Sequence, residues 1–323
     1  MEIGKMNFFM KKYPRIIFIG DTNFSIICLK KLLLHNYYIV GVITNPDNKN
    51  KTYNFSLKKF SLNNGIYVLQ PRSLKDINFL NSLYKLKADL QIVVSFKFLP
   101  KKVWSYPSLG TFNLHPSFLP KYRGAAPIQW SIINGDNETG LTTFLLNEKI
   151  DQGKILLQKK VIINNKENMG LLKFRLSNLG ADLIIKTIQG IINNKIKSFS
   201  QKRKISSFFK KAPKIYRKDC RINWNKPIKE IYNKIRGLSP YPSAYTTLLS
   251  EKNTIKEFKI INADYKIKKH NKIIGLIKWN NYNFKIYVKN GYIFIIEGQL
   301  EGKKKMNIKN IFNGLKKKYI IAL

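Results

Sequence analysis

The sequence predicts an α/β protein with a mostly parallel sheet, followed by a small antiparallel β-barrel. Up to residue 197, apolar runs that suit buried strands alternate with helix-length amphipathic segments. After residue 213 the pattern changes to short alternating segments at close spacing, which is typical of a small barrel. The chain has 323 residues, enough for about two domains that each bury a core.

The first elements are predicted to form a β-α-β unit. Residues 15–19 are an apolar run that ends at Gly20, and residues 40–44 form a second such run. Asn23 is placed to cap the helix between them, which we expect to reach Leu34. A right-handed crossover to a parallel sheet is the usual arrangement. The second and third glycines of a dinucleotide-binding motif are missing after Gly20, so we expect no nicotinamide cofactor.

The remaining elements follow from the same patterns. Residues 1–14 are predicted as a leader, and the polar, basic residues 198–213 as a linker between domains. Further helices are predicted at 57–63, at 76–86 and at 227–236. Another follows Pro127 and ends at about residue 133, and a long one is capped by Asn168 and ends at about residue 192. Further strands are predicted at 67–69, 90–94, 141–146, 155–162, 245–249, 258–263, 273–278, 284–288 and 292–297.

The composition argues against several classes of protein. Apolar residues make up 44% of the chain, so disorder is not expected. Cys28 and Cys220 form no pair motif, which indicates a reducing compartment without disulfides. Three scattered histidines make a zinc site unexpected, and we predict no metal. No apolar run reaches the ~18 residues of a membrane-spanning helix, so we expect a cytoplasmic enzyme. A monomer is expected as a separate point.

The formal net charge of +41 has two interpretations. A strongly basic chain suits a polyanionic partner, above all a nucleic acid. The abundance of Lys, Asn, Ile, Phe and Tyr also fits codons that have drifted toward A and T. Residues 214–323 carry 25 Lys and Arg against 7 Asp and Glu, so the C-terminal part is the more densely basic. Both interpretations stay open on composition alone.

The stretch Gly110–Pro127 carries the strongest chemical signal. Asn113 and His115 lie two residues apart on a predicted strand and therefore point to one face. Pro116 ends that strand, which leaves a carboxamide and an imidazole where a strand passes into a loop. The segment 151–153, Asp-Gln-Gly, follows in a loop between two strands, and its carboxylate could orient the imidazole. A buried structural histidine is the alternative.

These residues are part of a longer string. Asn-x-His-x-Ser-x-x-Pro-x-x-x-Gly-x-x-Pro, followed by Asp-x-Gly, resembles the 10-formyltetrahydrofolate-dependent formyltransferases. Two further segments are similar to the members of this family that formylate methionine on initiator tRNA. They are Tyr-Arg-Gly-Ala-Ala-Pro-Ile-Gln and, after it, Asn-Gly-Asp-x-Glu-Thr-Gly. The similarity runs from about Arg15 to the C-terminus and includes Arg-Ile-Asn-Trp at 221–224 and Pro-Tyr-Pro at 240–242.

The resemblance implies a Rossmann-like catalytic domain at 15–197 and an oligonucleotide-binding-like barrel at 214–323 that binds tRNA. It implies 10-formyltetrahydrofolate as the formyl donor and initiator methionyl-tRNA as the partner. We expect the catalytic residues to be Asn113, which donates to the oxyanion, His115, a second donor and proton carrier, and Asp151, which holds the imidazolium. The residues expected to line the folate site are Ser117, Phe118, Leu119, Pro120, Phe96 and Phe98. Ordinary packing beneath a loop is the alternative for the two last phenylalanines, and the family usually has Leu in place of Phe118.

Basic residues are expected to contact the tRNA. They are Lys49, Lys51, Arg123, Lys202, Arg203 and Lys204. The loop at 46–53 is shorter than the Arg/Gly-rich loop of similar enzymes and has no arginine, so it could instead be simply solvated. A structural salt bridge is the alternative for Arg123.

Two other functions remain as alternatives. A folate-dependent formyltransferase could act on a small amine, such as glycinamide ribonucleotide or an amino sugar. A nucleic-acid-binding protein whose transferase site has decayed belongs to a different class. The basic C-terminal part argues against the first alternative, and the intact Asn113, His115 and Asp151 argue against the second.

Overall fold

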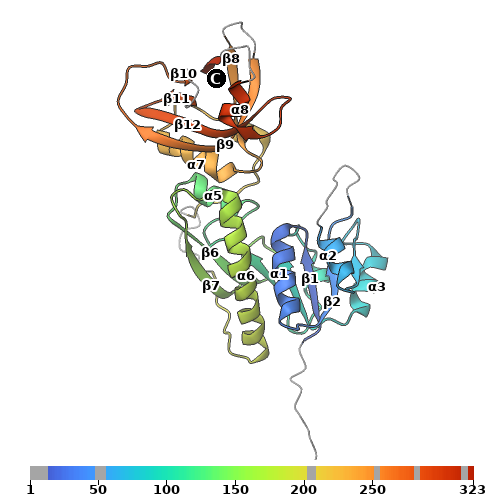
Figure 1. Ribbon diagram of the computed structural model, residues 1–323. Coiled ribbons are helices and arrows are strands. Elements are labelled where there is room, and N and C mark those ends of the chain that lie inside the picture. The colour runs from blue at the N-terminus through green and yellow to red at the C-terminus, as the bar shows by residue number, and fades with distance from the viewer. Residues whose placement is uncertain (1–13, 48–55, 202–208, 251–254, 280–283, 314–318) are drawn as a thin grey trace, which may run out of the picture. The chain divides into compact units, whose positions relative to one another are not determined.

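A computed structural model describes residues 14–47, 56–201, 209–250, 255–279, 284–313 and 319–323 (Figure 1). Its contacts divide the chain into two compact units. The first comprises 1–115, 142–158 and 177–201, and the second comprises 116–141, 159–176 and 202–323. Each unit therefore combines segments that are far apart in the sequence. No helix in the described part of the chain is long and apolar enough to cross a membrane.

The first sheet has seven strands in the order β3-β2-β1-β4-β5-β6-β7. The pairs from β3 through β5 are parallel, and β5 pairs antiparallel with β6. The predicted mostly parallel sheet is therefore confirmed. Its strands are β1 (Ile16–Gly20), β2 (Ile39–Ile43), β3 (Val68–Leu69), β4 (Leu90–Val94), β5 (Thr111–His115), β6 (Glu138–Leu145) and β7 (Ile155–Ile162).

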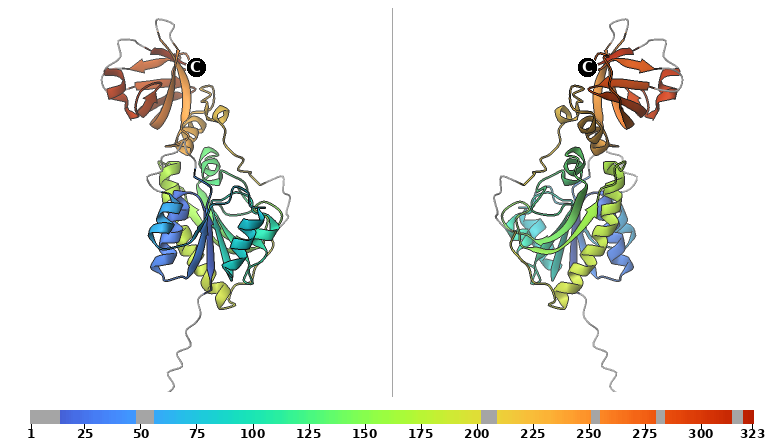
Figure 2. Two further views of the ribbon diagram at one scale, coloured as in Figure 1. Left: turned by 90° about the vertical axis from the view of Figure 1, so that its right-hand side faces the viewer. Right: turned by 90° about the vertical axis from the view of Figure 1, so that its left-hand side faces the viewer.

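Helices cover both faces of this sheet (Figure 2). On one face α3 packs its Phe79 and Leu83 against Ile17, Ile19 and Val93 of the central strands. Such double cover explains why β1 and β4 are apolar at nearly every position. The helices up to residue 192 are α1 (Asn23–Leu34), α2 (Leu57–Asn63), α3 (Ile77–Lys85), α4 (Lys101–Trp104), α5 (Pro127–Ile133) and α6 (Met169–Ile192). Of these, α5 belongs to the second unit.

Helix starts show where local patterns were sufficient and where they were not. Asn168 caps α6 as predicted, because its Oδ1 accepts from the backbone N–H of Leu171 at 2.9 Å. The predicted Asn23 cap is wrong: Asn23 is the first helical residue and Thr22 is the N-cap. Ser25 explains the shift, since its Oγ accepts from the Thr22 N–H at 3.3 Å.

The second sheet is an antiparallel barrel in the order β10-β11-β12-β9-β8-β14, with β13 paired to β12. An isolated bridge between Leu276 and Ile321 joins its two ends, so the predicted barrel is confirmed and nearly closes. Its strands are β8 (Ala244–Ser250), β9 (Ile255–Ile267), β10 (Ile277–Trp279), β11 (Phe284–Val288), β12 (Gly291–Leu300), β13 (Met306–Asn307) and β14 (Tyr319–Ala322).

Helix α7 (Ile228–Leu238) belongs to the core of the barrel unit. Ile231 and Ile235 are buried with Phe258 and Ile286 of the strands. Strand β9 is longer than the predicted 258–263, and its pairing with β12 is irregular between Ile295 and Gly298. The predicted strand at 273–278 begins only at residue 277. A 3-10 turn at Arg217–Cys220, α8 (Ile308–Asn313), β13 and β14 were not predicted.

Candidate active site

The carboxyl ends of the central parallel strands lie at one edge of the first sheet. Gly20 of β1 is in register with Val94 of β4, and Val94 is in register with Leu114 of β5. The loops that follow these strands therefore leave from the same edge. This edge is where open α/β sheets bind their ligands.

Asn113 and His115 occupy alternate positions at the end of β5. Asn113 lies between Val93 and Phe144 of the neighbouring strands, and His115 lies opposite Thr142. The Asn113 side chain is half-buried, and no protein group within the described residues bonds to its carboxamide. His115 is 4% exposed, and its ring lies edge-on to Phe144 with centroids 6.5 Å apart. The strand thus presents an amide donor and a closely packed imidazole on one face.

The structure brings Asp151 to His115. The distance from His115 Nδ1 to Asp151 Oδ2 is 3.9 Å, and the Asp151 side chain is 14% exposed. Water is largely excluded from both groups, so the attraction between a protonated imidazole and this carboxylate is only weakly screened. The imidazole and the acid that the sequence placed about thirty-five residues apart are therefore neighbours in space.

The loop that carries Asp151 is held in an unusual backbone conformation. Asp151 has a φ of +53°, in the left-handed region that Asp and Asn tolerate better than most residues. A Cβ on Gly153 would lie 1.6 Å from the Leu145 carbonyl oxygen, so only glycine fits at this close approach. Gln201 Nε2 donates to the carbonyl oxygens of Asp151 and Gly153 at 2.9 and 3.0 Å. These contacts fix the position of the carboxylate.

Gln201 is a residue that the sequence analysis missed. It belongs to the segment 198–213, which was predicted only as a linker, yet it is 9% exposed. The preceding Phe199 pairs with Ile155 through backbone hydrogen bonds of 2.8 and 3.0 Å. Nothing in the local sequence distinguishes a glutamine that supports a loop from a solvated one in a polar segment.

The residues expected at the folate site differ in their exposure. Ser117 and Leu119 are buried, and Ser117 Oγ donates to the Lys121 carbonyl oxygen at 2.7 Å. Phe118 is half-buried, and the Lys160 ammonium lies 5.6 Å from the centre of its ring. Pro120 is half-buried as well. The serine therefore shapes the turn, while Phe118 keeps part of its surface accessible.

Phe96 and Phe98 leave the carboxyl end of β4, as predicted. Phe96 is partly buried and packs against the cluster that contains Ile17 and Val93, so packing explains much of its position. Phe98 is 58% exposed and is available to a ligand. Only the second phenylalanine has a free face of the kind that a pterin ring could cover.

Five of the six residues expected to contact tRNA lie outside the described residues: Lys49, Lys51, Lys202, Arg203 and Lys204. Arg123 is described and half-buried, and its carbonyl oxygen accepts from the Ala212 N–H at 2.9 Å. Gly124 pairs with Ala212 in an isolated parallel bridge, and a Cβ on Gly124 would lie 2.3 Å from the Ala212 carbonyl oxygen. The C-terminal end of the predicted linker therefore lies against the segment that follows β5.

Tyr122 strengthens this junction. Its hydroxyl donates to Asp136 at 2.7 Å, and Lys210 Nζ binds the same carboxylate at 2.6 Å. The Tyr122 N–H also donates to the Lys210 carbonyl oxygen at 2.6 Å. Burial, followed by the neighbouring Asp136, raises the pKa of Tyr122 above its ordinary value, so the phenol remains a neutral donor.

No cluster of three or more His, Cys, Asp or Glu side chains suited to a metal ion occurs among the residues that the structure describes. The groups that the structure does bring to the end of β5 are a carboxamide, an imidazole and a carboxylate. Such a set can stabilise a developing oxyanion and move protons.

Comparisons with known proteins show the family of the chain. A sequence model of formyl transferases matches residues 14–188, and one of the formyl transferase C-terminal domain matches residues 214–316. The methionyl-tRNA formyltransferase of Parabacteroides distasonis is 42% identical over 316 residues, covering 95% of this chain and 98% of the relative. That of Flavobacterium johnsoniae is 43% identical over 305 residues, covering 93% and 96%.

Solved structures show the same fold. The N-formyltransferase of Helicobacter canadensis, in complex with folinic acid and dTDP-3-aminofucose, is 24% identical with a TM-score of 0.65, and the match covers 91% of this chain and all of that one. The sugar 3N-formyl transferase WlaRD, with dTDP and 5-N-formyl-THF, is 26% identical with a TM-score of 0.62 and coverages of 90% and 99%. Taken with the 42% and 43% identities over nearly the full length, the chain belongs to the methionyl-tRNA formyltransferase family.

Proposed function

We propose that this protein transfers the formyl group of 10-formyltetrahydrofolate to the α-amino group of methionine on initiator methionyl-tRNA. Near-full-length relatives that carry this name support the substrate pair. The observation that carries the proposal is the pairing of His115 with Asp151 at 3.9 Å, two residues beyond Asn113. We assign catalysis to residues 15–197 and tRNA binding to residues 214–323, joined by 198–213.

The reaction is an acyl transfer, and each group has one task. The methionine amine attacks the formyl carbon, and negative charge develops on the formyl oxygen. The half-buried Asn113 carboxamide donates to that oxygen, and protonated His115 supplies a second donor. Asp151 holds the imidazolium in place while the proton of the amine passes to the leaving nitrogen. Removal of the Asn113 donor, as in Asn113→Ala, should lower kcat by about a hundred-fold.

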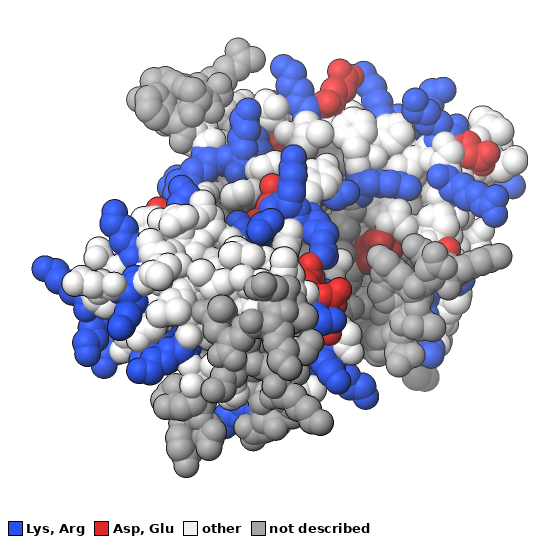
Figure 3. All heavy atoms as spheres, turned by 90° about the horizontal axis from the view of Figure 1, so that it is seen from above, with Lys and Arg blue, Asp and Glu red and all other residues white. Residues whose placement is uncertain are grey.

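The folate donor fits the residues at the sheet edge. Phe98 has an exposed ring face, and Phe118 is only partly covered. We assign these two rings to the walls of the folate site, while Ser117 and Leu119 shape the turn behind it. The basic surface suits the tRNA: Figure 3 shows Lys and Arg side chains spread over the viewed face with few Asp or Glu between them. When such a surface binds phosphates, counterions leave the nucleic acid, so the affinity falls as the salt concentration rises.

A single-turnover assay tests the proposal. Formyl-labelled donor is mixed with excess enzyme and charged initiator tRNA, and labelled formyl-methionyl-tRNA is expected. The rate should fall steeply as salt rises, because each lost phosphate contact contributes to the slope. Glycinamide ribonucleotide and a dTDP-amino sugar serve as competing acceptors. Formylation of either small amine without formylation of the tRNA, or a tRNA rate that is flat in salt, would contradict the proposal.

A further inference from the structure

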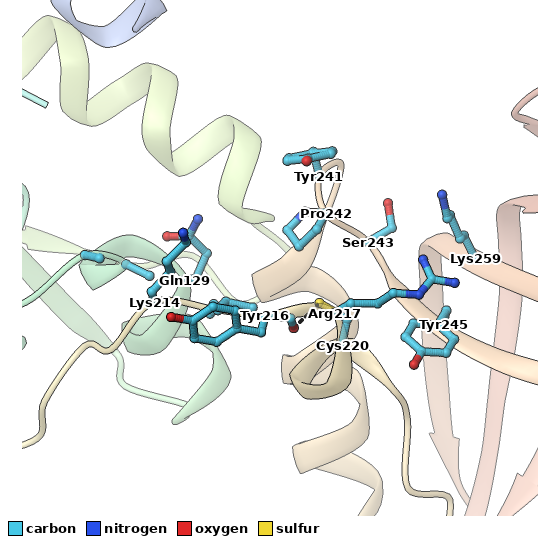
Figure 4. Close-up of a pocket in the computed structure, with 13 residues that line it drawn as sticks. Gln129, Lys214, Tyr216, Arg217, Cys220, Tyr241, Pro242, Ser243, Tyr245 and Lys259 are labelled. Carbon is cyan, nitrogen blue, oxygen red and sulfur yellow. Dashed lines mark hydrogen bonds between the residues drawn. The ribbon is translucent and has the colours of Figure 1, made fainter. Parts of the chain in front are cut away.

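A cavity in the second unit is formed by three segments. They are the region around the start of α5, the segment 214–220 and the loop that leads into β8, with Lys259 of β9 at one side (Figure 4). Its volume is about 510 Å³, within the range of pockets that bind small molecules. None of its lining residues has a role in the site at the end of β5.

Two exposed tyrosines from different segments, Tyr216 and Tyr241, are among the residues that line this cavity (Figure 4). Tyr216 is 56% exposed and Tyr241 is 79% exposed. Flat ring faces of this kind are the surfaces on which unpaired nucleobases stack.

Cations lie beside the rings of Tyr216 and Tyr245, which also lines the cavity. The Lys214 ammonium is 5.4 Å from the centre of the Tyr216 ring, and the Arg217 guanidinium carbon is 5.0 Å from that of Tyr245. Lys259 also lines the cavity, and no carboxylate does. Glu257 pairs with Arg217, so Lys214 and Lys259 supply most of the uncompensated positive charge. Aromatic rings alternating with cations are typical of sites for single-stranded nucleic acid.

We propose that this cavity binds one unpaired nucleotide of the tRNA substrate, with its base stacked on Tyr216 and Tyr241 and its phosphate held by Lys214 and Lys259. The inference rests on the proposed function, because it takes the acceptor to be an RNA. Stacking accepts any base, so the cavity contributes affinity for the RNA and adds little sequence preference. This contact with the tRNA would depend on base stacking as well as on basic charge.

Paired substitutions in the full-length protein test the assignment. Tyr216→Leu and Tyr241→Leu remove the ring faces, while Tyr216→Phe and Tyr241→Phe keep them. The matched control is Tyr67→Leu, because Tyr67 is 55% exposed and lies just before β3. Each leucine variant should weaken binding of fluorescently labelled initiator tRNA by about ten-fold, the scale of losing one base–aromatic stack. The phenylalanine variants should rescue most of this loss.

Kinetics separate this role from a structural one. The leucine variants should raise KM for charged tRNA by a similar factor, whereas kcat at saturating tRNA and KM for the formyl donor change little. In tRNA that carries 4-thiouridine, ultraviolet crosslinks should map to peptides containing residue 216 or 241. Unfolding midpoints equal to the wild type would show that the exposed substitutions leave the fold intact.

The outcomes distinguish the two proposals. If the wild type formylates tRNA and both leucine variants keep its affinity and KM within two-fold, the cavity assignment is wrong and the proposed function stands. If the leucine variants lose binding of free dTDP but not of tRNA, the cavity takes a sugar nucleotide and the inference is overturned. If the wild type does not formylate tRNA, the proposed function itself fails.

Discussion

The substitution Asp151→Asn tests the chemistry at the end of β5 with little structural disturbance. Asparagine has nearly the same shape and also tolerates the φ of +53° at this position. The hydrogen bond from Gln201 reaches the backbone carbonyl of residue 151, so it remains in the variant. The change therefore removes the charge from the carboxylate and leaves the loop in place.

The distance sets the expected size of the effect. Two unit charges 3.9 Å apart attract by about 4 kcal/mol at an effective dielectric constant of about 20. At about 1.4 kcal/mol per ten-fold, complete loss of this attraction corresponds to roughly a thousand-fold in rate. The asparagine dipole keeps part of it, so kcat should fall by about 10²–10³.

The assay is steady-state formylation of charged initiator tRNA, with KM measured for both substrates. Glu148→Gln is the matched control, because Glu148 lies in the same loop, is 70% exposed and pairs with the exposed Lys101. That variant should be as active as the wild type. A folded Asp151→Asn enzyme with kcat within two-fold of the wild type would refute the assignment of Asp151.

Three further predictions follow from neighbouring contacts. Gly153→Ala should lower the free energy of unfolding in urea by about 3 kcal/mol or more, because its Cβ meets the Leu145 carbonyl oxygen; an unchanged unfolding midpoint would contradict the strain. Gln201→Ala removes two hydrogen bonds to the loop of Asp151, so it should lower the free energy of unfolding by about 2 kcal/mol. It should also lower kcat by a larger factor than it raises either KM. The hydrogen bond from Lys166 holds the pKa of Asp264 below its ordinary 3.8. The charged carboxylate therefore stabilises the fold at pH values above 3.8, and this contribution is lost as the pH falls through the lower pKa of the folded state. Thermal melts should therefore show a small deficit for Asp264→Asn at pH 7 that disappears in acid, and a deficit that persists would argue against this pair.

The sequence was sufficient where a feature depends on neighbours in the chain. Strand alternation placed Asn113 and His115 on one face, and α2 begins and ends at the predicted Leu57 and Asn63. The closure of the barrel by β14 was not foreseen, because four residues after a lysine run give a weak local signal and gain their order from β8.

The approach of Asp151 to His115 is a feature that the local sequence could not predict. The resemblance to a known family suggested that these side chains cooperate, but the means by which they meet is tertiary. A turn at Gly153, a left-handed residue at position 151 and a glutamine fifty residues later together set the 3.9 Å separation. None of these contacts has a signature in the local sequence.

The bridge between Gly124 and Ala212 has a consequence for the newly made chain. The amides of Tyr122 and Ala126 donate to the carbonyl oxygens of Lys210 and Ala212. While the ribosome is still adding the residues before 210, the turn after the catalytic strand therefore cannot close. A protein truncated near residue 200 would keep its reactive side chains but lose the support for this turn, so attempts to express the catalytic part alone should extend beyond residue 213.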